Sequence, residues 1–131
     1  QSRGRREAAM MALKDLADSL GNENVIAMGD FNDTPDAVSF RIIDGTLVNL
    51  GADLHERGEG TIRYEGKWDL IDMFMVSPSL SERAEMEVCR VPFLMTWERK
   101  HAGEKPLRTY SGPRYIGGVS DHCPIILKIY H

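Results

Sequence analysis

The chain has 131 residues, which fits one domain of ordinary size and leaves little room for two. Hydrophobic residues make up 42% and charged residues 27%, which indicates a folded globular protein rather than a disordered one. The net charge of −4 gives no overall positive field that would attract nucleic acid, so such a substrate would depend on local Lys and Arg groups. No apolar stretch approaches the roughly 20 residues that a membrane-spanning helix needs.

Cysteine usage and the N-terminal residues exclude two further classes. Cys89 and Cys123 lie far apart without a CxxC spacing, which is too few for a disulfide scaffold and wrong for a zinc site, although one disulfide stays open. The first residues, QSRGRREAAM, are basic but no apolar segment follows them, which argues against a signal peptide. Because the chain does not start with Met, we expect a piece of a longer protein, whose compartment stays undetermined.

The N-terminal third predicts a helix, a strand and a second helix. Residues 3–20 carry apolar residues on one stripe at helical spacing, and Gly21 follows as a C-terminal cap. Residues 24–28 form an apolar run that is typical of a strand buried on both faces. Thr34-Pro35-Asp36 predicts the start of a short helix ending near Ile43, because Pro suits the first helical position and an acid suits the first turn.

The remaining two thirds predict mainly strands. Residues 68–76 and 124–130 predict strands because they are largely apolar, and residues 85–93 predict one because polar and apolar residues alternate. Two polar stretches are predicted as loops, residues 51–66, which include a short strand at 61–64, and residues 98–118, which are rich in Gly, Pro, Lys and Arg. Loops as long as the second one are usually functional or mobile. The mixed order of helices and strands indicates an α/β or α+β layered domain.

Acidic residues lie at or in three predicted strands. Asp30 follows the first strand, Asp72 lies inside the strand at 68–76, and Asp121-His122 precedes the last strand. Acids that meet at one edge of a sheet can assemble a metal and phosphate site on a rigid frame. The alternative for Asp30 and its neighbour Asn32 is a tight turn before the next helix.

Three segments resemble the motifs of a known family and occur in the family's order: GDFN at 29–32, WDLIDMFMVS at 68–77 and GGVSDHCPI at 117–125. They are similar to the endonuclease/exonuclease/phosphatase superfamily, which has the deoxyribonuclease I-like fold. The run RTYSGPRYIGG before SDH resembles a bacterial branch of it. At about 5% per residue type, GDFN alone arises by chance about once in a thousand chains of this length.

The resemblance implies a fold and a place within it. The family's domain is a four-layer α/β/β/α sandwich with mixed, mostly antiparallel sheets and flanking helices. Residues 1–131 correspond to the C-terminal portion of a single such domain, with the N-terminal half absent. Half of a two-sheet sandwich leaves one sheet face uncovered, so we expect the chain to self-associate.

Matching motif positions implies a role for each of five residues. Asp30 would orient or deprotonate the attacking water, and Asn32 would hold that water or a phosphate oxygen. Asp121 would help to bind the metal, and His122 would stabilise the scissile phosphate. Asp72 would accept a hydrogen bond from His122 and orient it. A carboxylate beside a metal-bound phosphate can act as a general base, and an amide donor adds no charge.

The resemblance also implies a divalent cation, usually Mg²⁺, and oxygen-rich donors with one histidine favour Mg²⁺ or Mn²⁺ over Zn²⁺. Asp121 and Asp30 are the metal ligands that this chain offers. The family's N-terminal half normally contributes an Asn and the main Glu ligand, and nothing in this chain matches them. We therefore expect the isolated chain to be inactive.

Two hypotheses for function remain open. The parent protein is a Mg²⁺-dependent phosphate-ester hydrolase that acts on nucleic acid, a nucleotide, a phosphoinositide or a sugar phosphate. Alternatively, the chain is catalytically incomplete and serves as a non-catalytic fold or binding module.

Polar residues of the long loop before SDH are candidates for contact with the substrate. Lys105, Arg108, Tyr110 and Arg114 would clamp a phosphate or shape the rim of the pocket. A solvated basic loop is an equally open alternative. The other histidines, His55, His101 and His131, are predicted to be loop or terminal residues.

Overall fold

The computed structural model describes residues 2–21 and 23–131. Its helices are α1 (Arg3–Ser19), the 3₁₀ helix η1 (Val38–Ile43), α2 (Ala52–Glu56), α3 (Pro78–Ser81) and the 3₁₀ helix η2 (Pro92–Leu94). Its longer strands are β1 (Ile26–Asp30), β5 (Asp72–Val76), β6 (Ala84–Val88), β7 (Met95–Glu98), β8 (Gly103–Pro106) and β11 (Ile125–Ile129). The shorter strands are β2 (Val48–Asn49), β3 (Ile62–Tyr64), β4 (Lys67–Asp69), β9 (Tyr110–Ser111) and β10 (Arg114–Tyr115).

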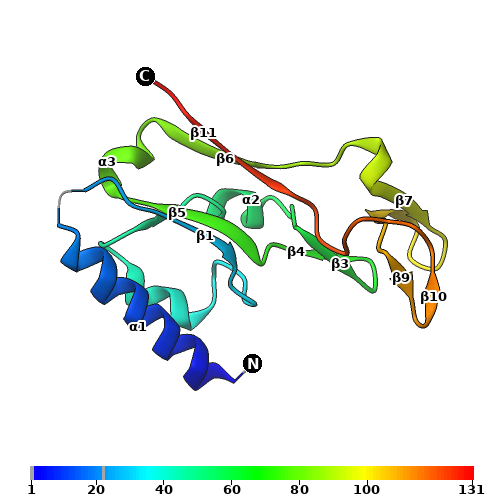
Figure 1. Cartoon of the computed structure of the whole chain (residues 1–131), viewed down its shortest axis with the longest axis horizontal. Coiled ribbons are helices and arrows are strands. Elements are labelled where there is room, and N and C mark those ends of the chain that lie inside the picture. Colours follow the sequence, from blue (N-terminus) through cyan, green and yellow to red (C-terminus); the bar gives the residue numbers. More distant parts are fainter. Residues whose placement is uncertain (1, 22) are drawn as a thin grey trace.

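The fold class is α+β, as predicted, and every strand pairing among the described residues is antiparallel. Figure 1 shows α1 on one side of β1 and β5, and the β6–β11 ladder on the other side. The hairpins formed by β7 to β10 extend from one end. No helix of the described chain is both long and apolar enough to cross a membrane.

Strand β5 is the centre of the core. It lies between β1 and β2 in a three-stranded sheet, and its residues Met73 to Val76 are all buried. Met10 and Ala17 of α1 and Phe40 and Ile43 of η1 belong to the same hydrophobic cluster. Because β5 has a neighbour on each edge and packing on each face, it holds the β1–β5 register in place.

Strand β1 contradicts the expectation of burial on both faces. Val25 and Ala27 pack against the core, whereas Ile26 and Met28 are exposed, Met28 to 67%. Side chains alternate between the two faces of a strand, and in this chain only one face of β1 is covered. Strand β1 is also at the edge of its sheet.

The helix predicted to begin at Pro35 begins later, at Val38. Residues 34–37 form a turn closed by the Ala37 amide, which donates to the Thr34 carbonyl at 3.0 Å. Ala37 is then extended, with ψ 146°, so the helical conformation restarts only after it. The Thr34 hydroxyl donates to Asp36 at 2.6 Å, so side chains of the predicted first turn stabilise the turn instead.

The predicted strand at 68–76 is two strands, β4 and β5, separated by Leu70 and Ile71. Asp72 therefore begins a strand and does not lie inside one. Strand β4 pairs with β3, whereas β5 pairs with β1 and β2, so the chain changes sheets between them. At this point the Ile71 amide donates to the side chain of Thr61, and the Ile71 carbonyl accepts from the amide of Phe31. The strand predicted at 85–93 ends at Val88: the amide of Cys89 still donates to the Pro124 carbonyl at 2.8 Å, but Pro124 has no amide with which to return the bond.

The long loop predicted at 98–118 is largely two hairpins, β7–β8 and β9–β10. Its glycines and proline mark turns within paired segments: Gly112, at φ 57°, and Pro113 connect β9 to β10. The loop predicted at 51–66 contains α2, which includes His55, as well as the predicted short strand, here β3.

We expect the chain to self-associate through the open face of β1, which carries Ile26 and Met28. Sedimentation at increasing concentration should show oligomers, and Met28→Lys should reduce their population, because a charge opposes burial of this face. Met11→Lys is the matched control, since Met11 is 57% exposed on α1. A monodisperse monomer at all concentrations would refute the expectation.

Candidate active site

The antiparallel register of β1 and β5 brings two acids together. Asp30, the last residue of β1, is the direct partner of Asp72, the first residue of β5. Like charges directly opposite each other destabilise a sheet, so this pair needs compensating partners. One partner of Asp30 is local: the amide of Asn32 donates to its Oδ1 at 2.8 Å.

His122 is the partner of Asp72. Its Nδ1 lies 2.7 Å from Oδ2 of Asp72, and both side chains are mostly buried, with 28% and 15% of their surfaces exposed. An ionised carboxylate only accepts hydrogen bonds, so Nδ1 donates. Nε2 is thereby directed to the other side of the ring, where Oδ1 of Asp121 lies 3.8 Å away.

The acids around His122 decide its protonation. Partial burial, the largest influence, lowers the pKa of the imidazole, but the hydrogen bond and charge of Asp72 and the charges of Asp121 and Asp30 act against it. The net result is a pKa raised above the ordinary value of 6.5. The three carboxylates therefore favour the protonated form of the imidazole relative to an ordinary histidine.

Thr61 connects the segments that carry Asp72 and His122, and the sequence analysis missed it. It is fully buried, and its Oγ1 accepts from the amides of Ile71 and Asp72, each at 3.3 Å. Its carbonyl accepts from the amide of Cys123 at 2.7 Å. A threonine at a strand start is not conspicuous in a sequence, because its role here depends on two segments far along the chain.

Ser120 was also missed. Its Oγ accepts from the amide of His122 at 3.0 Å, which stabilises the turn that presents the imidazole. The available signal was local, because a serine hydroxyl often accepts a hydrogen bond from the amide two residues later.

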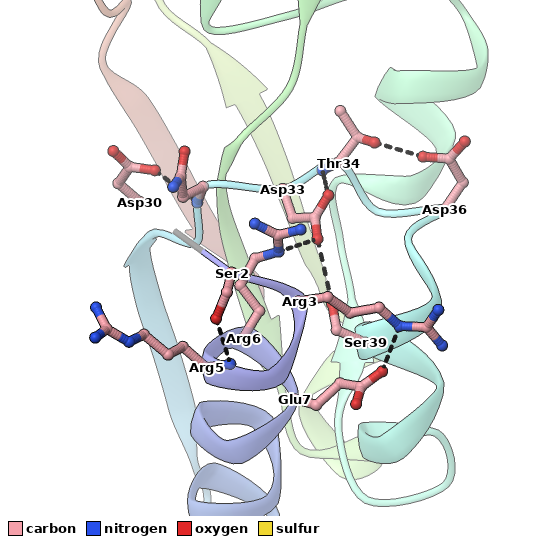
Figure 2. Close-up of polar contacts among 11 residues, drawn as sticks. Ser2, Arg3, Arg5, Arg6, Glu7, Asp30, Asp33, Thr34, Asp36 and Ser39 are labelled. Atoms are coloured by element: carbon pink, nitrogen blue, oxygen red, sulfur yellow. Dashed lines mark hydrogen bonds and ion pairs between the residues drawn. The ribbon is translucent and has the colours of Figure 1, made fainter.

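The GDFNDTP segment divides into Asp30 to Asn32 and Asp33 to Pro35, and Figure 2 draws polar contacts of Asp30, Asp33 and Thr34. Asp33 anchors the segment: its Oδ2 lies 2.8 Å from Nε of Arg6 in α1 and accepts from Ser39 at 3.4 Å. Asn32 has φ 52°, a left-handed conformation that asparagine tolerates. The turn predicted as the alternative is thus present, and it orients the carboxylate of Asp30 as well.

Two cavities meet at this site. A cavity of about 380 Å³ has Asp72, Ser120 and His122 in its wall, with apolar residues including Met28 and Phe74. A second cavity, of about 320 Å³, is lined by Arg108, Thr109, Tyr110, Val119, Ser120 and Asp121. Ser120 lines both.

The predicted phosphate-contacting residues do not all lie together. Arg108 and Tyr110 line the cavity beside Asp121. Arg114 lines neither cavity at the site; it is exposed on β10, opposite Ser111. Lys105 lines a separate cavity, which Arg108 also lines.

The side chains that converge here suit a hard divalent cation. Asp30, Asp72 and His122 each offer a donor atom, and these atoms lie within 4.8 Å of one another. Asp121, predicted as a ligand, lies beside the same imidazole with its carboxylate 58% exposed. Carboxylate oxygens match the ligand preference of Mg²⁺ and Mn²⁺, whereas Nδ1 of His122 is already bonded to Asp72.

Comparison with known proteins gives one finding. The model of the endonuclease/exonuclease/phosphatase family matches residues 1–131, the whole chain. Comparisons with curated proteins and with solved structures found no match. Members of this family are hydrolases that act on phosphate esters and generally use a divalent metal. A match over the full chain shows membership, and it agrees with the three sequence motifs. The chain belongs to the endonuclease/exonuclease/phosphatase family.

Proposed function

We propose that the parent protein hydrolyses phosphate esters with a divalent metal, and that Asp30, Asn32, Asp72, Asp121 and His122 carry the reaction. The observation that supports this proposal most directly is the convergence of Asp30, Asp72 and His122, whose donor atoms lie within 4.8 Å of one another. The three residues come from three separate segments of the chain. Asp72 and His122 also line the cavity of about 380 Å³, and polar side chains that converge beside a cavity are typical of a catalytic site.

In this proposal Asp72 orients His122, and His122 stabilises the substrate. The short Nδ1–Oδ2 contact holds the ring with Nε2 directed away from Asp72. A protonated imidazole places a hydrogen-bond donor and a positive charge where a phosphate develops negative charge in the transition state. The raised pKa keeps that proton on the ring over a wider pH range.

Asp30 acts as the general base, or orients the water. One of its oxygens accepts the amide of Asn32, which fixes the carboxylate, and the other can accept a proton from water. Asp30 is exposed at the end of β1, so water reaches it. The side-chain amide of Asn32 holds the water or a phosphate oxygen without adding charge.

Asp30 and Asp121 are the residues that would hold Mg²⁺ or Mn²⁺, which supplies Lewis-acid polarisation of a phosphate oxygen when bound. Both side chains are exposed, and two carboxylates are a small donor set for tight binding. We therefore expect the parent protein to hydrolyse phosphate esters and the 131-residue chain alone to be inactive. The substrate carries a phosphate ester, as in nucleic acids, nucleotides, phosphoinositides and sugar phosphates.

Replacement of Asp30 tests the proposed base. In the parent protein, Asp30→Ala should lower kcat for bis(p-nitrophenyl) phosphate or p-nitrophenyl phosphate with Mg²⁺ by at least about 100-fold, since general-base catalysis contributes that much. Asp44→Ala, at an exposed acid after η1, is the control and should keep the wild-type rate. Wild-type turnover by Asp30→Ala would exclude Asp30 from the reaction.

The pH dependence of His122 tests its pairing with Asp72. In the metal-free chain, NMR titration should place the His122 pKa above 6.5, and Asp72→Asn should lower it, because the hydrogen-bonded charge is lost. A pKa raised on folding adds stability that is fully present below the unfolded-state pKa and is lost as the pH rises through the folded-state value. Unfolding free energies should therefore show this contribution in wild type and less of it in Asp72→Asn.

Asp69→Asn is the control for that titration, because Asp69 lies in β4, with its carboxylate 3.5 Å from Nζ of Lys67. It should leave the His122 titration unchanged. An equal shift in both variants would show that general charge, and not the Asp72 contact, raises the pKa.

Thr61 should act as a positioning residue. Thr61→Val keeps the shape of the side chain but removes Oγ1, so it should lower kcat in the parent protein about 10-fold with little change in KM, the size typical for loss of an outer hydrogen-bond partner. Thr61→Ser restores the oxygen and should restore most of the rate. Equal losses of kcat in the Val and Ser variants would assign Thr61 to packing alone.

A further inference from the structure

A third cavity lies beyond Arg108, between β3 and the β7–β8 hairpin. Its volume is about 370 Å³, and Arg108 lines both it and the cavity beside Asp121. Its other charged lining residues are Arg63, Glu65, Glu98, Lys100 and Lys105. Four permanently cationic side chains thus face two carboxylates, which leaves an excess of two positive charges in a chain whose net charge is −4.

Arg63 is the buried element of this cavity. Its side chain is only 8% exposed, and Nη2 donates to the carbonyl of His101 at 2.8 Å. Nη1 lies 3.5 Å from Oε1 of Glu98, an ion pair with poor hydrogen-bond geometry. Within residues 2–21 and 23–131, the buried Nε and Nη1 groups have no hydrogen-bond acceptor. An unsatisfied buried donor is costly, and a guanidinium donor forms its strongest hydrogen bonds with an anion.

Glu98 neutralises only part of the positive charge in this cavity. Its Oε2 accepts from Lys105 at 3.0 Å, and its Oε1 lies 3.2 Å from Nδ1 of His101. The hydrogen bond from Lys105 is the main cause that lowers the pKa of Glu98, so the carboxylate is ionised. The carboxylate of Glu98 therefore contacts Arg63, His101 and Lys105. Its single negative charge cannot balance the positive charges of Arg63, Lys105 and Arg108.

We propose that this cavity binds a second phosphate group of the substrate, with Arg63 and Lys105 as its main contacts and Arg108 between the two phosphate positions. The inference deepens the proposed function and rests on it. Guanidinium and ammonium donors around a cavity are the usual partners of a phosphate dianion. The substrate class is then an ester that carries a second phosphate on the same molecule.

Inorganic phosphate is the probe for this subsite. It is titrated into the ¹⁵N-labelled 131-residue chain in EDTA at constant ionic strength, and amide shifts are followed by NMR. Saturable shifts are expected in residues 98–106. Lys105→Gln and Arg108→Gln should each weaken binding about 10-fold, the size of a lost charge-assisted hydrogen bond. Two variants are used because Arg108 is exposed and its replacement does not disturb the Glu98 network.

Lys128→Gln is the matched control. Nζ of Lys128 lies 3.1 Å from Glu87, a contact like that of Lys105 with Glu98, but on β11 outside the cavity. The Lys128→Gln variant should bind inorganic phosphate with the same affinity as the wild-type chain.

The outcomes separate the two proposals. Shifts confined to residues 119–123, or equal affinities in wild type, Lys105→Gln and Arg108→Gln, would overturn the subsite and leave the proposed hydrolysis standing. Saturable shifts at residues 98–106 that both variants weaken would support the subsite even if the parent protein failed to hydrolyse phosphate esters. In that case the proposed function alone would fail.

Discussion

The antiparallel pairing of β1 with β5 is the constraint on which the site depends. It puts Asp30 directly opposite Asp72, where two carboxylates repel each other. Strand β5 is buried on both faces, so the register cannot slip to relieve the repulsion without exposing Met73 to Val76. The imidazole of His122 and the amide of Asn32 compensate instead. The residues that offset the repulsion between Asp30 and Asp72 are thus also residues that are suited to phosphate chemistry.

Hydrogen bonds of Thr61 and an ion pair of Arg6 connect this arrangement to other parts of the chain. Thr61 bonds to the start of β5 and to Cys123, so the residue after His122 is attached to the same point as Asp72. Arg6 of α1 pairs with Asp33 and holds the GDFNDTP segment against the first helix. Side chains held by a rigid second layer keep the geometry that catalysis needs. Stability and chemistry therefore share the same contacts.

Charge is unevenly distributed around the site. Residues 95–118 contain five Lys or Arg and two Glu, whereas the whole chain has a net charge of −4. The positive segment lies next to the acids, with Arg108 between the cavity at Asp121 and the cavity at Arg63. In the proposed function, an anionic substrate is attracted to the basic side, while the acids face the position proposed for the metal. Both signs are needed for hydrolysis of a phosphate ester.

The sequence alone determined the family, the α+β class and the identity of the converging residues, because these depend on local motifs and on the alternation of apolar residues. It placed α1 and β11 to within one residue at each end, α1 from apolar residues at helical spacing and β11 from an apolar run. It was wrong on the residues 98–118, where glycine and proline mark hairpin turns and not a loop.

Only the tertiary structure decided the rest. It showed which face of β1 is covered, that Thr61 links two distant segments, and that Arg63 is buried beside Glu98. Each of these facts depends on contacts between residues far apart in the chain, and no pattern within a single segment contains that information. Local sequence patterns identified the residues of the site, and contacts between distant segments determined how these residues come together.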